Sequence, residues 1–106
     1  MATVTSKQRY EGTITEDGTV TVSGRGECRV KIVGNTWGSG TIALSDDLCV
    51  DYAAIDDAGT AQTISTGSRT WVFDYEDVDK VNVRLTMSGS STPDVDVLVS
   101  FTKAPQ

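Results

Sequence analysis

The 106-residue sequence contains no histidine. This absence excludes Ser-His-Asp and Cys-His catalytic arrangements, imidazole metal ligands and the commonest general base of enzymes. Cysteine is also scarce, and the one cationic neighbour of Cys28, Arg29, is expected to leave the opposite face of its strand. No nucleophile therefore stands out, and we predict a protein that is not an enzyme.

Basic residues are too few to balance the acidic ones, with 9 Lys and Arg against 15 Asp and Glu and a formal charge of -6. Such a balance repels phosphate backbones, so nucleic acid is not an expected partner, whereas a basic protein surface is. No apolar run approaches the roughly 20 residues of a spanning helix, so no membrane partner is expected either. The N-terminus lacks the apolar core of a secretion signal, which favours a cytoplasmic chain or one whose signal was removed.

Helical periodicity is absent, and apolar residues alternate with polar ones in short segments that recur about every 8 to 12 residues between turn signals. This spacing predicts an all-β fold, an antiparallel β-sandwich of jelly-roll or Ig-like type with about eight strands. We expect one domain over 10–103 and an N-terminal arm over 1–9. The predicted strands cover 10–14, 19–23, 27–33, 41–45, 48–54, 61–66, 69–75, 80–87 and 94–101.

Two hairpins follow from the turn signals, one joining 10–14 to 19–23 and the other joining 80–87 to 94–101. The second would place three residues of one strand across from two acids of the next, namely Lys80, Asn82 and Arg84 against Asp94 and Asp96. In the segment 69–75 the aromatic residues stand at every second position, which favours core packing over a ligand platform.

The two cysteines differ in phase. Cys28 alternates with Val30 and Ile32 and is predicted to be a buried free thiol, whereas Cys49 lies out of that pattern. A disulfide between them is the less favoured alternative. Acidic turns at 74–79 and 46–51 offer oxygen ligands for calcium, but their spacing matches no calcium loop, so we interpret them as solvated turns and predict neither metal nor cofactor.

Trp37 lies in the glycine-rich turn between Gly34 and Gly40. A flat indole on such a turn can stack on a sugar ring, with Asn35 and Tyr52 as further candidate ligand-binding residues. The alternative is that Trp37 folds back as a lid over the end of the sandwich, and this interpretation is favoured because an exposed tryptophan is costly in water.

Two stretches resemble small all-β virion proteins of tailed bacteriophages. They are Val33-Gly34-Asn35-Thr36-Trp37-Gly38-Ser39-Gly40-Thr41-Ile42-Ala43-Leu44-Ser45-Asp46 and Val81-Asn82-Val83-Arg84-Leu85-Thr86-Met87-Ser88-Gly89. The chain departs from that pattern after Asp46, where Asp47-Leu48-Cys49 stands in place of a Gly-Gly and an aromatic. The resemblance implies a non-enzymatic virion protein, a capsid decoration, head-fibre or tail accessory, located in the virion and binding a capsid or tail protein.

The N-terminal arm is the expected contact with such a partner, because an extended polar segment is suited to adding a strand to a neighbouring sheet. Its candidate partner-binding residues are Thr3, Val4, Thr5, Lys7 and Arg9. Copies of the chain are expected to assemble as a trimer or higher oligomer. The alternative functions are a carbohydrate-binding module that uses Trp37 and, less favoured, an adhesion domain of Ig type excised from a larger surface protein.

Overall fold

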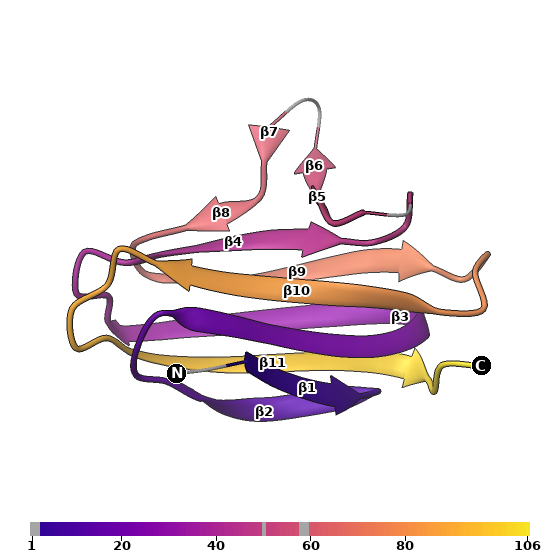
Figure 1. The fold of residues 1–106 in the computed structure, drawn as a ribbon, viewed down its shortest axis with the longest axis horizontal. Helices are drawn as coiled ribbons and strands as arrows, with labels where there is room; N and C mark the ends of the chain where they lie inside the picture. Colours follow the sequence, from indigo (N-terminus) through magenta and orange to yellow (C-terminus); the bar gives the residue numbers. More distant parts are fainter. Residues whose placement is uncertain (1–2, 50, 58–59) are drawn as a thin grey trace.

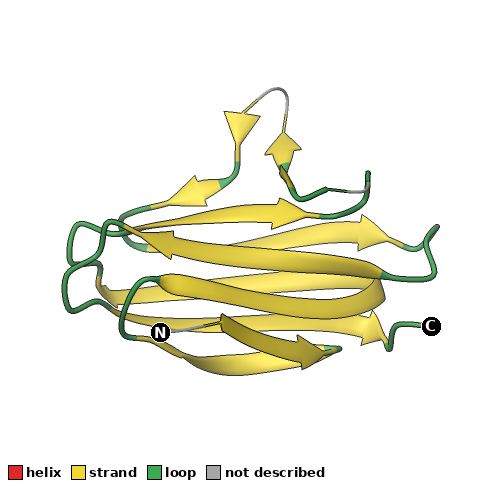
Figure 2. Cartoon of the chain, viewed as in Figure 1, coloured by secondary structure: helices red, strands yellow, loops and turns green. Residues whose placement is uncertain are grey.

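The computed structural model describes residues 3–49, 51–57 and 60–106, and these residues form strands and loops without a helix (Figures 1 and 2). Seven strands have five or more residues and four have two residues. Their bounds are β1 (Thr3–Lys7), β2 (Arg9–Ile14), β3 (Gly18–Thr36), β4 (Thr41–Asp46), β5 (Ala53–Ala54), β6 (Asp56–Asp57), β7 (Thr60–Ala61), β8 (Thr63–Ile64), β9 (Ser68–Tyr75), β10 (Val81–Ser88) and β11 (Asp94–Lys103).

Strand β3 belongs to two sheets that pack face to face. Its first part pairs with β10 and, in parallel, with β1, and β4 extends this sheet beyond β10. Its second part pairs with β11 and β9, and β2 extends that sheet beyond β11. The strand orders are therefore β1-β3-β10-β4 and β2-β11-β3-β9, with β5 and β8 on β4 and a separate β6–β7 pair. The predicted all-β antiparallel sandwich is confirmed, apart from the parallel β1–β3 pair.

The chain changes sheet twice at one corner of the sandwich. In β3 the corner lies at Gly24 to Gly26, where Gly24 packs against the Phe101 ring and Gly26 has a φ of 83°. Between β1 and β2 the corner residue is Gln8, with a φ of 63°. Its backbone N–H donates to the Ser23 carbonyl of one sheet at 2.7 Å, and its carbonyl accepts from Phe101 N–H of the other at 2.8 Å. Gln8 thereby joins both sheets.

The core lies between the sheets and consists of the inward residues of each alternating strand. In β10 every second residue, from Val81 to Met87, is buried, and the same alternation holds along the second part of β3 and along β11. Cys28 is a buried free thiol, as predicted, and Cys49 is an exposed free thiol. Trp71 and Tyr75 are buried, which confirms core packing for the aromatic segment. No helix in the described part of the chain is long and apolar enough to cross a membrane.

Both predicted hairpins are wrong. Strand β2 pairs with β11 rather than with β3, and β10 and β11 lie in different sheets. Each connecting turn carries the chain across the sandwich, so that consecutive strands bury their apolar faces from opposite sides. Turn signals in a sequence mark where a strand ends, but they do not distinguish a return within one sheet from a crossing to the other.

The cross-strand charge pairs predicted with the second hairpin are consequently not formed. The Arg84 guanidinium lies over the Tyr52 ring, 3.5 Å from its centroid. On the other sheet Asp96 accepts hydrogen bonds from the Thr13 hydroxyl at 2.7 Å and from the Asn35 amide at 3.2 Å.

The predicted strand over 48–54 is also wrong among the described residues. Only Ala53 and Ala54 form a strand there, β5, while Val50 lies outside the described residues. The Asp46 carboxylate accepts a hydrogen bond from Leu48 N–H at 3.3 Å, which helps to turn the chain away from β4. In place of the predicted strand over 61–66 the structure has Ala61 at the end of β7 and the two-residue β8, and Ala58 and Gly59 of the predicted loop before it lie outside the described residues.

The sequence suggested an N-terminal arm that lies apart from the sandwich, but residues 3–9 form part of the sandwich. Residues 3–7 are β1, paired with β3 of the same chain, and Arg9 begins β2. The alternation explains the difference, because Val4 is partly buried against the core while Thr3, Thr5 and Lys7 are exposed. Met1 and Ala2 of the predicted arm lie outside the described residues.

Candidate interaction site

Several side chains that could take part in catalysis or metal binding instead hold strands of the fold together. Among residues 3–49, 51–57 and 60–106, no group of three or more Cys, Asp or Glu side chains could hold a metal ion. The Cys28 thiol is enclosed between the sheets, and burial raises its pKa to about 12. A thiol with this pKa stays protonated at neutral pH, so Cys28 is not an activated nucleophile.

The acidic turn after β4 braces one end of the sandwich. Asp46 accepts a hydrogen bond from the Tyr75 hydroxyl at 2.7 Å, and burial together with this carboxylate raises the pKa of Tyr75. Asp47 accepts from both the backbone N–H and the side-chain amide of Asn82, at 2.7 Å and 2.6 Å, and Asn82 in turn accepts from the Ser23 hydroxyl. These carboxylates tie β4, β9, β10 and β3 together.

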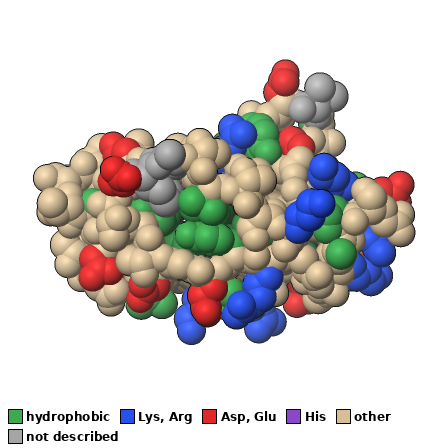
Figure 3. All heavy atoms as spheres, turned by 60° about the horizontal axis from the view of Figure 1, so that its bottom comes forward, with side chains coloured by type: hydrophobic (Ala, Val, Ile, Leu, Met, Phe, Trp, Pro, Cys, Tyr) green, Lys and Arg blue, Asp and Glu red, His purple; other side chains and the backbone are tan. Residues whose placement is uncertain are grey.

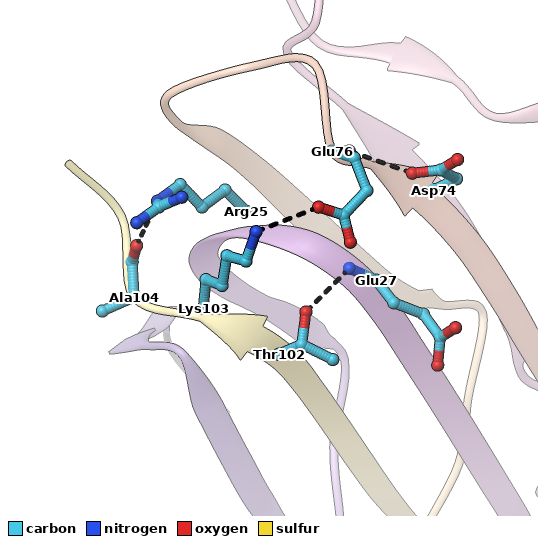
Figure 4. A network of polar contacts seen from close by, with 7 residues as sticks. All are labelled: Arg25, Glu27, Asp74, Glu76, Thr102, Lys103 and Ala104. Atoms are coloured by element: carbon cyan, nitrogen blue, oxygen red, sulfur yellow. Dashed lines mark hydrogen bonds and ion pairs between the residues drawn. The ribbon is translucent and has the colours of Figure 1, made fainter.

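The second acidic turn ties the end of β9 to the end of β11, beside the corner of β3 (Figure 4). Asp74 accepts from Glu76 N–H at 3.0 Å, and Glu76 forms an ion pair with Lys103 at 3.2 Å. The neighbouring Arg25 donates to the carbonyl of Ala104 at 3.0 Å. All four side chains lie at the surface, where such contacts position segments without contributing much stability.

Trp37 is half-buried and packs against the end of the core. Its Nε1 donates to the Gly67 carbonyl at 3.1 Å, and its ring lies so close to Gly34 that a Cβ there would be 2.0 Å from Nε1. Asn35, two residues before it, is held by Asp96. Tyr52 follows the opposite end of β4 and is covered by Arg84, so the structure does not bring it together with Trp37 and Asn35.

The candidate partner-binding residues of β1 lie along one side of the molecule. Thr3, Thr5 and Lys7 alternate with Val4 and are exposed. Among the described residues, β1 pairs only with β3, so its other edge has no partner strand. Figure 3, which brings the lower side of Figure 1 forward, shows hydrophobic side chains in the middle of this face with acidic and basic groups around them.

A second open edge, that of β9, was missed in the sequence. Strand β9 pairs with β3 from Ser68 to Tyr75 without a register shift, and no other described strand pairs with it. Its outward Val72 is 54% exposed. A groove of about 430 Å³ is lined by β9 on one side and by Ile55, Asp56 and Gln62 on the other, and Trp71 donates to the Gln62 side-chain oxygen at 3.0 Å. The available signal in the sequence was Val72, an apolar residue out of phase with the aromatic residues of its strand.

No known family model matches the sequence, and no curated protein matches it. Among solved structures, the chain is similar to the pre-peptidase C-terminal domain of a collagenase from Bacillus anthracis. The alignment covers 94% of this chain and 93% of that chain, with 10% sequence identity and a TM-score of 0.40. A similarity of this size assigns no function.

Proposed function

We propose that this chain is a non-enzymatic structural protein of a bacteriophage virion, an accessory or decoration protein that binds a capsid or tail protein and copies of itself. The observation that carries the proposal is that β1 in one sheet and β9 in the other each present an open strand edge, on opposite sides of the sandwich (Figure 1). Open edges bind other chains by strand addition. The virion context comes from the sequence resemblance.

The engagement of the polar groups also supports assembly over catalysis. The cysteine inside the core is protonated, and three carboxylates of the acidic turns, those of Asp46, Asp47 and Glu76, are bonded to neighbouring strands. The β1 edge offers the cation Lys7, which suits an acidic segment of a capsid or tail protein, and Arg9 follows at the start of β2, where it pairs with Glu11.

Carbohydrate binding is less favoured because the three residues that would serve it already have partners. The Trp37 N–H is bonded to Gly67, the Asn35 amide to Asp96, and the Tyr52 ring faces Arg84. Titration with oligosaccharides therefore should leave the tryptophan fluorescence unchanged. A saturable change that Trp37→Phe abolishes would instead support the sugar-binding function.

Virions banded in a density gradient test the proposal. We expect mass spectrometry to find the chain in the particle band of the phage that encodes it, and immunogold to label a repeating position. A chain found only outside the particle band would overturn the virion assignment. Particles made without the chain should bind it when it is added back, and Lys7→Glu should weaken this rebinding whereas Lys80→Glu, at another exposed lysine, should not.

A further inference from the structure

Strand β9 lacks several of the features that usually protect an edge, although it carries the two charged residues Arg69 and Asp74. Natural edge strands carry lysine, proline or a β-bulge, or they are covered by another segment. The sequence of β9, Ser-Arg-Thr-Trp-Val-Phe-Asp-Tyr, has neither lysine nor proline, and its register with β3 is unbroken from Ser68 to Tyr75. An eight-residue edge of this kind is suited to pairing with another strand.

The hydrogen-bond pattern identifies which backbone groups face outward. Gly34 N–H donates to the Gly67 carbonyl at 3.2 Å, and these residues continue the β3–β9 register by one step. They are therefore a hydrogen-bonded pair, and such pairs alternate along an antiparallel ladder. It follows that Arg69, Trp71 and Phe73 direct their N–H and C=O groups to β3. The residues between them, Thr70, Val72 and Asp74, direct theirs to the open edge.

The side chains of Thr70, Val72 and Asp74 complement the same three side chains of a second copy whose strand runs in the opposite direction. With Val72 opposite Val72 of a second copy, Thr70 lies opposite Asp74 of that copy, and the threonine hydroxyl can donate to the carboxylate. On the inner face the same register sets Trp71 opposite Phe73 of the second copy, beside the groove. A register centred on Asp74 would set two carboxylates against each other, which is unfavourable.

We propose that β9 of one copy pairs antiparallel with β9 of a second copy, about a two-fold axis through Val72. This contact deepens the self-assembly in the proposed function and rests on that part of it, but it does not depend on the virion. Charge permits it, because β9 carries one cation, Arg69, and one anion, Asp74, and two chains of charge -6 meet there along a neutral strip. More distant charges are screened beyond about 8 Å at physiological salt.

A two-fold contact closes on itself, so it gives a dimer rather than a fibre. The trimer or higher oligomer expected from the sequence would need a further contact, such as one through β1. Ile55, Asp56 and Gln62 line the groove beside β9 and would face the partner's strand across it. The apolar side chains that line it on this side are those of Ile55, Trp71, Val72, Phe73 and Tyr75.

Sedimentation velocity from micromolar to millimolar chain concentration tests the pairing. We expect a reversible dimer, and we expect Val72→Lys to raise the dissociation constant at least tenfold, because an edge lysine loses its hydration in the pair. Leu48→Lys is the matched control, since Leu48 is 50% exposed and lies outside β9. It removes a surface hydrophobic group of similar exposure and should leave the dimer unchanged.

The register has its own tests. Thr70→Asp should weaken the dimer, because it sets a carboxylate at position 70 opposite Asp74 of the second copy. Adding Asp74→Thr should restore the dimer, because an aspartate then again lies opposite a threonine. In a Cys49→Ser background, oxidation should cross-link Val72→Cys between copies at the two-fold axis, whereas Thr70→Cys should stay uncrosslinked. Circular dichroism checks that each variant is folded, which these exposed positions allow.

Three results would overturn the inference. They are a monomer at every concentration, a dimer that Val72→Lys does not weaken, and a dimer that Leu48→Lys weakens equally. A cross-link at position 70 but not at 72 would refute the register. These outcomes can be distinguished from those of the virion test. A monomer that still binds virions rejects only the β9 pair, whereas a β9 dimer that is absent from virions rejects only the virion assignment.

Discussion

Gly24 allows β3 to turn the corner between the two sheets because the Phe101 side chain occupies the space where a Cβ would lie. A Cβ at this position would be 2.2 Å from Cγ, 2.4 Å from Cδ2 and 2.5 Å from Cβ of Phe101. These atoms form the base of the side chain, so rotation of the ring cannot remove the overlap. In Gly24→Ala, β3 and β11 must therefore separate at the corner.

Such overpacking costs about 1 to 3 kcal/mol. The backbone of Gly24 is outside the left-handed region, so alanine also gains about 0.4 to 1 kcal/mol from the lower entropy of its unfolded chain. We therefore expect a net loss of about 1.3 kcal/mol in the free energy of unfolding, within the range of about 0 to 2.6 kcal/mol that the two effects allow. Urea unfolding followed by circular dichroism measures it as a lower midpoint at an unchanged m value.

Gly12→Ala is the matched control. Its Cβ would be 2.3 Å from the Tyr10 hydroxyl oxygen and 2.8 Å from Cζ, at the far end of a half-buried side chain that can swing aside. This variant should keep or slightly raise the free energy of unfolding. If the two variants fall within about 0.5 kcal/mol of each other, the range of ordinary surface substitutions, the corner does not depend on this contact.

Two further predictions concern pH. The pKa of Tyr75 is raised in the folded state, so its contribution to stability is complete below the ordinary value of 10.0 and declines above it. Tyr75→Phe should lower the free energy of unfolding by about 1.5 kcal/mol at neutral pH, by loss of the hydrogen bond to Asp46, and flatten its decline above pH 10.0. An equally steep decline in the variant would contradict this. Hydrogen bonds from Ser90 and Gly89 hold the pKa of Asp17 below 3.8, so its contribution is complete above 3.8 and lost as pH falls further. Acid unfolding of Asp17→Asn should show a smaller loss of stability below pH 3.8, and an unchanged profile would refute the role of Asp17.

Alternation of apolar residues was sufficient to predict the strands and the sandwich, because burial of one strand face depends on local sequence. It gave the positions of β9, β10 and β11 and the burial of Cys28 correctly. Strand partners could not be predicted in the same way. A turn such as 89–93 has the same composition whether the next strand pairs with the last one or packs against it from the other sheet.

The candidate sites show the same limit. Trp37 was recognised from its glycine-rich turn, but its hydrogen bond to Gly67 joins it to a residue 30 positions later, which no local pattern indicates. Val4 looked like part of a free arm because five residues show too little alternation to define a strand. The β9 edge depends on the order of all the strands in its sheet, so it follows only from the fold.

The four outer strands of the two sheets differ in how they are protected, and this difference separates their roles. Strand β4 is covered by β5 and β8, and β2 is exposed but carries an Arg9–Glu11 ion pair. Strand β1 ends in Lys7, which disfavours indiscriminate strand pairing and favours an acidic partner. Strand β9 carries only one cation and one anion, Arg69 and Asp74, has neither lysine nor a bulge, and complements its own inverted sequence. We therefore expect β1 to be the edge for a different protein and β9 the edge for a second copy, so that loss of one contact leaves the other intact.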